Sequence, residues 1–168
     1  MLLSGVNWLI FLALVAGHGL AVRLLVPEAH RLNYRRFALS RESLIANGLW
    51  FGAVAACAAQ QVTRPVEAHW LLTAFGVALY AVGAALVTAA FRTNPYFVPA
   101  VVAPPAIIRD GIYAWVGHPG YVGMVLCLKG IVLVLGQPSG DVFFILYTLF
   151  IVRQINREEE LLWRSWTS

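Results

Sequence analysis

Residues 121–157 read YVGMVLCLKGIVLVLGQPSGDVFFILYTLFIVRQINR, two apolar runs joined by the short turn GQPSG at 136–140. Glycine and proline in this turn end one helix and let the chain reverse before the next. A connection this short joins antiparallel helices. The stretch therefore predicts a tight helical hairpin whose two ends away from the turn are neighbours.

The composition extends this apolar character to the whole chain. Of 168 residues, 60% are hydrophobic and 12% are charged, and the mean hydropathy is +0.74. Soluble domains carry about 25% charged residues, and a chain of this length has too little interior to bury so much apolar surface. Lipid must therefore be part of the solvent, which excludes disordered chains, disulfide scaffolds, coiled coils and nucleic-acid-binding arms. Cys57 and Cys127 lie in apolar stretches and are predicted to be buried thiols, not metal ligands.

Three further apolar runs approach or exceed the roughly 20 residues that a helix needs to cross a bilayer. We therefore predict an all-α integral membrane protein with five transmembrane helices in a single domain, residues 1–168. The predicted spans are residues 4–26, 43–62, 69–91, 120–135 and 141–157, followed by a tail at 158–168. No basic residue precedes the first run and no clear cleavage site follows it, so we expect a retained span, not a signal peptide.

The basic residues predict the orientation of these spans. Ten of the twelve lie in the first connection, the third connection or the last helix and tail: Arg23, Arg31, Arg35, Arg36, Arg41, Arg92, Arg109, Arg153, Arg157 and Arg164. Only Arg64 lies in the connections on the opposite side. By the positive-inside rule, the N-terminus is outside and the C-terminus is cytoplasmic. The arginines at 31–41 are expected to contact anionic lipid headgroups.

The third connection, residues 92–119, is long and unusual. It holds five of the eight prolines and stays apolar around 98–102 and 106–108. Irregular backbone cannot face lipid, so this segment must lie in the interface, pack on protein or line a cavity. Long structured connections of this kind are often functional. Within it, Asn94 and Tyr96 follow the third span, where we favour a helix stop over a substrate gate.

Polar residues gather where the hairpin begins and ends. His118 and Tyr121 lie at the start of the fourth span, and Glu158 and Glu159 lie at the end of the fifth. The hairpin places these groups across a short gap. A histidine, a tyrosine and paired carboxylates beside a helix start suit a small polar cofactor that carries cationic groups, and apolar walls nearby suit a lipophilic substrate. The sequence predicts a cofactor pocket at the cytoplasmic face.

Several polar residues have simpler interpretations. Glu160 is spaced to form an ion pair with Arg157 or Arg164 on the same helix. Lys129 lies inside the fourth span. Either it has a function, or its long side chain extends along the helix so that the amine reaches the polar edge of the membrane. His18 is expected to be a packed donor between helices. Gly117, Gly120 and Gly123 are also spaced for close helix packing.

Three motifs then appear in order: Gly-Ile-Tyr at 111–113, His-Pro-Gly-Tyr-Val-Gly at 118–123, and Ile-x-x-Glu-Glu-x-x-Leu at 155–162. Together they resemble the isoprenylcysteine carboxyl methyltransferase and phospholipid methyltransferase superfamily, whose signature is Arg-His-Pro-x-Tyr-x-Gly, an apolar hairpin and a Glu-Glu pair. The resemblance covers about 110–162.

The resemblance implies transfer of a methyl group from S-adenosylmethionine to a lipophilic or prenylated substrate that enters from the membrane lipid, with a carboxylate, amine or thiol as the acceptor. Six residues are expected to bind the cofactor: Tyr113, His118, Tyr121, Gly123, Glu158 and Glu159. Three are substrate candidates: Asn94, Tyr96 and Arg109. No metal and no nucleic acid are implied. The catalytic residue stays unassigned, because a carboxylate acceptor needs no base whereas an amine or thiol must first lose a proton.

Two departures from the superfamily pattern keep alternatives open. Gly117 stands where the signature has arginine, and the sequence ends at Ser168, where relatives usually continue with a Gly-x-x-Tyr-x-x-Tyr-like stretch. One alternative is a non-catalytic membrane protein that keeps the methyltransferase fold for binding or assembly. Another is a nicotinamide-dependent membrane reductase of the sterol type.

Overall fold

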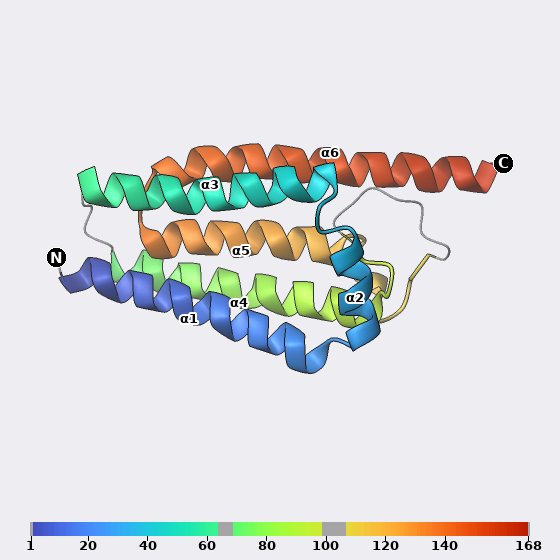
Figure 1. The fold of residues 1–168 in the computed structure, drawn as a ribbon, viewed down its shortest axis with the longest axis horizontal. Coiled ribbons are helices and arrows are strands. Elements are labelled where there is room, and N and C mark those ends of the chain that lie inside the picture. The colour runs from blue at the N-terminus through green and yellow to red at the C-terminus, as the bar shows by residue number, and fades with distance from the viewer. Residues whose placement is uncertain (1, 64–68, 99–106, 168) are drawn as a thin grey trace.

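The computed structural model describes residues 2–63, 69–98 and 107–167, and these residues form helices and connections without a strand (Figure 1). The elements are α1 (Leu2–Leu25), α2 (Glu28–Arg36), α3 (Arg41–Thr63), α4 (Trp70–Thr93), the 3₁₀ helix η1 (Gly111–Ala114), α5 (Pro119–Leu135) and α6 (Ser139–Thr167). The prediction of an all-α protein is confirmed. The connection that holds Arg64, at 64–68, and the central part of the third connection, 99–106, lie outside the described residues.

Three helices are long and apolar enough to cross a membrane: Gly5–Leu25 in α1, Arg41–Thr63 in α3 and Trp70–Thr93 in α4. They coincide with the first three predicted spans and indicate an integral membrane protein. α5 is equally apolar but has 17 residues. α6 joins an apolar first half to a charged second half.

The predicted hairpin of α5 and α6 is present (Figure 1). α5 ends at Leu135, and the next residue, Gly136, adopts the left-handed backbone conformation with φ 67°, as glycine does most easily. Buried Gln137 binds Gln61 of α3, and the backbone N–H of Ser139 donates to Gln60 Oε1 at 2.9 Å. The side chains of α3 thus fix the turn.

Lys129 pairs with Asp141 across the hairpin, with 2.5 Å between Nζ and Oδ1. Both side chains are partly exposed, and the amine also lies over the Phe144 ring. Lys129 therefore reaches out toward the turn, and its ion pair supports the structural interpretation.

The closest helix packing is between α4 and α5, through pairs of glycines. A Cβ atom at Gly83 would lie 2.6 Å from the carbonyl oxygen of Gly123, and one at Gly76 would lie 2.7 Å from that of Gly130. Since no larger residue fits at this separation, the four glycines set the distance between the two backbones. Leu128, Ile131 and Val134 of α5 are fully buried, so α5 forms the centre of the bundle.

The remaining helices surround α5. α3 and α6 lie side by side on one flank, and α4 and α1 lie on the other (Figure 1). Cys57 and Cys127 are buried free thiols, as predicted. His18 also fits its prediction, because its Nδ1 lies 3.4 Å from the Tyr80 hydroxyl between α1 and α4.

Two features of the fold were not anticipated. Residues of the first connection form α2, a short polar helix without a hydrophobic run, which lies across the end of the bundle. His30 Nδ1 donates to the carbonyl of Phe91 at 2.9 Å, and Asn33 Nδ2 donates to that of Pro95 at 2.9 Å. These bonds hold α2 against the chain that leaves α4. In addition, α6 continues as a helix to Thr167, through the segment expected as a tail.

Candidate functional site

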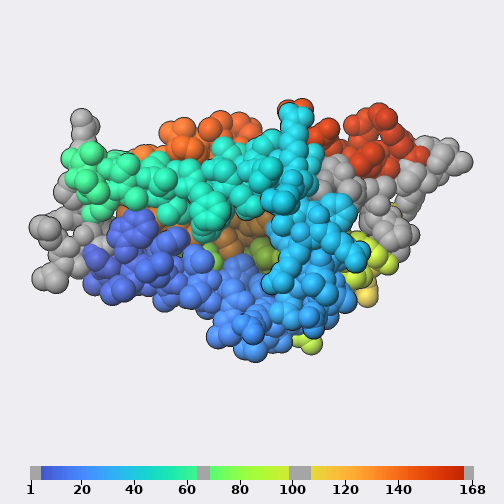
Figure 2. All heavy atoms as spheres, viewed as in Figure 1, coloured from blue at the N-terminus to red at the C-terminus, as the bar shows by residue number. Residues whose placement is uncertain are grey.

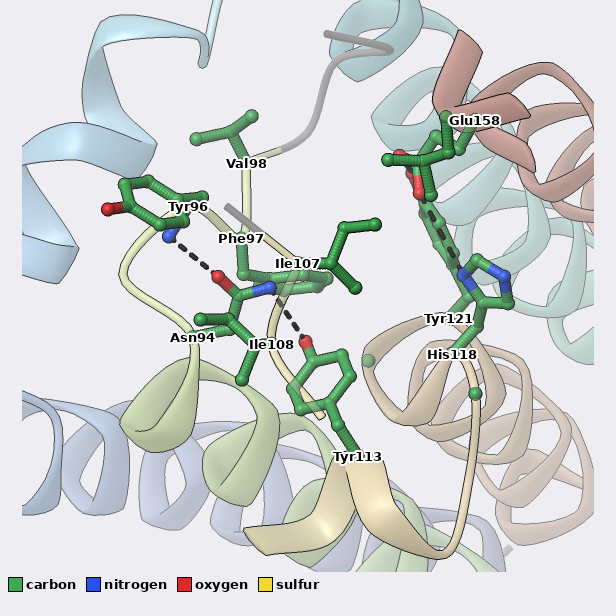
Figure 3. Close-up of a pocket in the computed structure, with 13 residues that line it drawn as sticks. Asn94, Tyr96, Phe97, Val98, Ile107, Ile108, Tyr113, His118, Tyr121 and Glu158 are labelled. Atoms are coloured by element: carbon green, nitrogen blue, oxygen red, sulfur yellow. Dashed lines mark hydrogen bonds and ion pairs between the residues drawn. The ribbon is translucent and has the colours of Figure 1, made fainter. Parts of the chain in front are cut away.

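A pocket of about 120 Å³ lies where α4 ends, α5 begins and the charged half of α6 passes (Figure 3). Its described walls are Asn94, Tyr96, Phe97, Val98, Ile107, Ile108, Tyr113, Gly117, His118, Gly120, Tyr121, Glu158 and Leu162. Val98 and Ile107 flank residues 99–106, so this volume covers only the described walls. Six of the nine predicted site residues line it.

The polar wall joins α5 to α6. Pro119 occupies the first turn of α5, where its missing N–H costs nothing, and His118 immediately precedes the helix. His118 lies between two carboxylates: its Nδ1 is 3.8 Å from Glu158 Oε2, and its Nε2 is 3.3 Å from Glu159 Oε1. The Tyr121 hydroxyl, on the same face of α5, donates a hydrogen bond to Glu158 Oε1. The predicted juxtaposition of these four residues is therefore observed.

The two glutamates differ in environment. The Glu158 side chain is 23% exposed and the Glu159 side chain is 61% exposed, so Glu158 is the inner carboxylate. Burial raises the pKa of Glu158 above its ordinary value, and the Tyr121 hydrogen bond and nearby His118 partly oppose that rise. A partly buried carboxylate with a raised pKa, inside a pocket, is typical of functional sites.

The opposite wall is built on the end of α4. Asn94 follows the last residue of α4, so the predicted helix stop is observed. Its side chain also serves the pocket: Nδ2 donates to the Tyr113 hydroxyl at 3.3 Å, and Oδ1 accepts the Tyr96 backbone N–H at 2.8 Å (Figure 3). Burial raises the pKa of Tyr113, so the phenol stays neutral. Gly111, the first residue of η1, has φ 56°, and a Cβ atom there would lie 3.1 Å from the Thr93 side chain. Glycine therefore lets η1 lie close to the end of α4.

Aromatic rings form the inner wall. Phe97 lies 6.3 Å from Tyr121 and 4.7 Å from Phe91, measured between ring centroids. Gly120 is in contact with the Phe97 ring, so a side chain at this position would displace the ring. Tyr34 of α2 packs on Phe91, which gives α2 a part in supporting this wall.

Three predicted residues lie outside the walls of the pocket. Gly123 faces Gly83 of α4 and serves helix packing. Arg109 is exposed, and Glu159 reaches the site only through His118. Glu160 pairs with Arg164, which is one of its two predicted partners.

Sequence reasoning missed the apolar walls, Phe97, Val98, Ile107, Ile108 and Leu162. The apolar character of the third connection was their signal, but it did not identify which residues face the pocket.

Residues 71–164 match the family model described as the isoprenylcysteine carboxyl methyltransferase family. The match extends from the first turn of α4 to the charged end of α6 and includes every residue named in the walls of the pocket. Comparisons with curated proteins and with solved structures gave no match.

Proposed function

The chain belongs to the isoprenylcysteine carboxyl methyltransferase family, and we propose that it is an integral-membrane enzyme that uses S-adenosylmethionine to methylate a lipophilic or prenylated acceptor. The observation that carries the proposal is the position of His118 between Glu158 and Glu159, with Tyr121 bonded to Glu158. These four side chains come from the two motifs that flank the hairpin.

The donor set suits the cofactor chemically. S-adenosylmethionine, when bound, supplies a methyl group carried on a positively charged sulfonium, and it also has an ammonium group. Glu158 provides negative charge for these groups inside the pocket, Glu159 adds negative charge from outside the wall beside His118, and Tyr113 and Asn94 offer hydrogen bonds on the other wall. Ring faces of Phe97 and Tyr96 suit a planar base. Because the described walls enclose less than the roughly 300–1,000 Å³ of common ligand pockets, we propose that the bound cofactor extends beyond them.

Catalysis in this pocket would rest on positioning. His118 and Tyr121 hold the carboxylate of Glu158 in one orientation, and the apolar inner wall keeps water from the reacting groups. Phe97, Val98, Ile107 and Leu162 give a lipophilic acceptor an apolar surface. The residues leave the acceptor group open among carboxylate, amine and thiol.

The proposed topology has five spans, with α5 and the apolar half of α6 completing the three long helices. The ten basic residues counted above lie on the elements around the pocket end of the bundle, which supports a cytoplasmic site and C-terminus. A reporter fused after Ser168 should be active only in the cytoplasm. If a fused reporter that works only outside the cytoplasm were active instead, the proposed orientation would be wrong.

Methyl transfer provides the test of function. Purified protein in lipid is incubated with isotopically labelled S-adenosylmethionine and with prenylated cysteine peptides, phospholipid amines or lipophilic thiols. We expect label in one acceptor class, lost in Glu158→Gln and kept in Glu160→Gln, which removes the same charge from an exposed ion pair. Labelling that is equal in both variants would contradict the site.

A second candidate is a non-catalytic binding protein. Gly117 lines the pocket and its position has open space, where the superfamily signature places an arginine. Tight binding of S-adenosylhomocysteine without labelling of any acceptor would favour this candidate.

A further inference from the structure

A second cavity, of about 1110 Å³, lies between α1, α2 and α3, with α4 and α5 beneath it. In the space-filling view the molecule is hollowed between α1 and α3 (Figure 2). This volume exceeds the roughly 300–1,000 Å³ of common ligand pockets. Since α1 and α3 are both long enough to cross a membrane, the opening between them faces lipid.

The cavity has a charged end and an apolar body. Arg23 from the last turn of α1 and Arg31 and Arg35 from α2 line one end, with Glu28 as the acidic residue among them. Val15, Trp50, Phe51 and Met124 line the body. Three guanidinium groups against one carboxylate leave this end positive. Apolar walls continue from it along the direction of the helices.

Some polar groups that line this cavity lack partners within the described part of the chain. Among the described residues, none of the three arginines forms an ion pair. Arg31 Nε and His18 Nε2 are shielded from solvent and have no hydrogen-bond acceptor or donor within the described part of the chain. Buried polar groups are normally satisfied, so the unpaired guanidinium nitrogen of Arg31 is a donor available to a partner from outside the chain, and its positive charge favours an anion.

We infer that this cavity binds one anionic phospholipid, with its phosphate at Arg23, Arg31 and Arg35 and an acyl chain beside Trp50 and Phe51. The lipid would enter from the bilayer between α1 and α3. The Phe91 ring lines this cavity, and the Phe97 ring, 4.7 Å away, lines the cofactor pocket. The two sites are therefore neighbours separated by an aromatic wall, and the lipid site does not depend on the proposed methyl transfer.

Native mass spectrometry of the full chain provides the test. The protein is released from mixed micelles that contain equal amounts of phosphatidylglycerol and phosphatidylcholine with identical acyl chains. We expect a one-to-one adduct with phosphatidylglycerol. In the double variant Arg31→Gln/Arg35→Gln, the preference for phosphatidylglycerol over phosphatidylcholine should fall by about 30-fold, because each arginine contributes roughly 1 kcal/mol to that preference. Arg36→Gln/Arg41→Gln removes the same charge from exposed residues that do not line the cavity, and should keep the preference.

A second pair of variants tests the acyl-chain site. Gly19 and Gly48 both have open space for a side chain, but only Gly19 borders the cavity. Gly19→Phe should lose the lipid adduct while still binding S-adenosylhomocysteine, and Gly48→Phe should keep both. Equal uptake of the two lipids by the wild type, equal loss in both arginine pairs, or an adduct that survives Gly19→Phe would overturn the inference. Displacement of the phosphatidylglycerol adduct by inorganic phosphate, or a dimer of the protein that carries no lipid, would also overturn the inference.

Discussion

The hydroxyl of Tyr121, in the first turn of α5, donates a hydrogen bond to Glu158 on α6. The two residues lie 37 positions apart, and this bond joins the two ends of the hairpin within the polar wall of the pocket. Because His118 also contacts Glu158, the inner carboxylate is held from two sides by groups of one motif.

Tyr121→Phe removes this hydrogen bond and keeps the ring. Glu158 then loses a donor in a partly buried site, so the carboxylate becomes harder to ionise. We expect the affinity for S-adenosylhomocysteine to fall by about tenfold, the effect of a lost hydrogen bond to a charged group. Isothermal titration calorimetry in detergent measures it. Tyr80→Phe, which removes the hydroxyl bonded to His18 away from the pocket, is the control and should bind normally.

The raised pKa of Glu158 predicts a pH-dependent stability. In the folded protein this carboxyl holds its proton above the ordinary value of 4.5, so the folded state binds the proton more tightly than the unfolded state. Its ionisation therefore destabilises the fold as pH rises from 4.5 through the raised pKa. At pH values above the raised pKa, Glu158→Gln should melt at a higher temperature than the wild type. Below pH 4.5 the two proteins should melt at similar temperatures. A difference in melting temperature that does not change with pH would contradict this assignment.

The glycine contacts between α4 and α5 predict a steric effect. Gly83→Val places methyl groups against the backbone of Gly123 and should destabilise the fold by about 1–3 kcal/mol, the range for overpacked cores. Gly117→Ala meets open space and should leave the melting temperature unchanged. Thermal unfolding followed by circular dichroism compares the two. Equal stability would mean that α4 and α5 can separate without cost.

Lys129 should have a small effect on stability and none on catalysis. Its pair with Asp141 is partly exposed, and such pairs contribute about 0–1 kcal/mol. A double-mutant cycle with Lys129→Gln and Asp141→Asn measures the coupling. Loss of methyl transfer in Lys129→Gln with an unchanged melting temperature would favour the functional interpretation instead.

The sequence predicted the parts of this fold that depend on local pattern. Apolar length gave the helices, the turn at 136–140 gave the hairpin, and the hairpin alone was enough to bring His118 and Tyr121 to Glu158. α2 was missed because its residues form a polar helix that is held by bonds to the backbone carbonyls of Phe91 and Pro95, which lie far away in sequence.

The walls of the pocket and the role of Gly123 depend on how helices pack in three dimensions. The sequence left Gly123 two roles, cofactor contact and close helix packing, and the structure shows the packing contact, because α5 turns that side toward Gly83 of α4. Phe97 and Ile107 come from an irregular connection, where no helical or strand period indicates which side chains face inward. Such residues are found only from the structure.

The role of Glu158 in cofactor binding is tested most directly by the dissociation constant of S-adenosylhomocysteine for the wild type, Glu158→Gln and Glu160→Gln, measured by calorimetry at one pH. We expect binding by the wild type and by Glu160→Gln, and binding weakened by at least about tenfold in Glu158→Gln, since a charged partner is lost inside the pocket. The same affinity in all three proteins, or no binding by the wild type, would contradict that role.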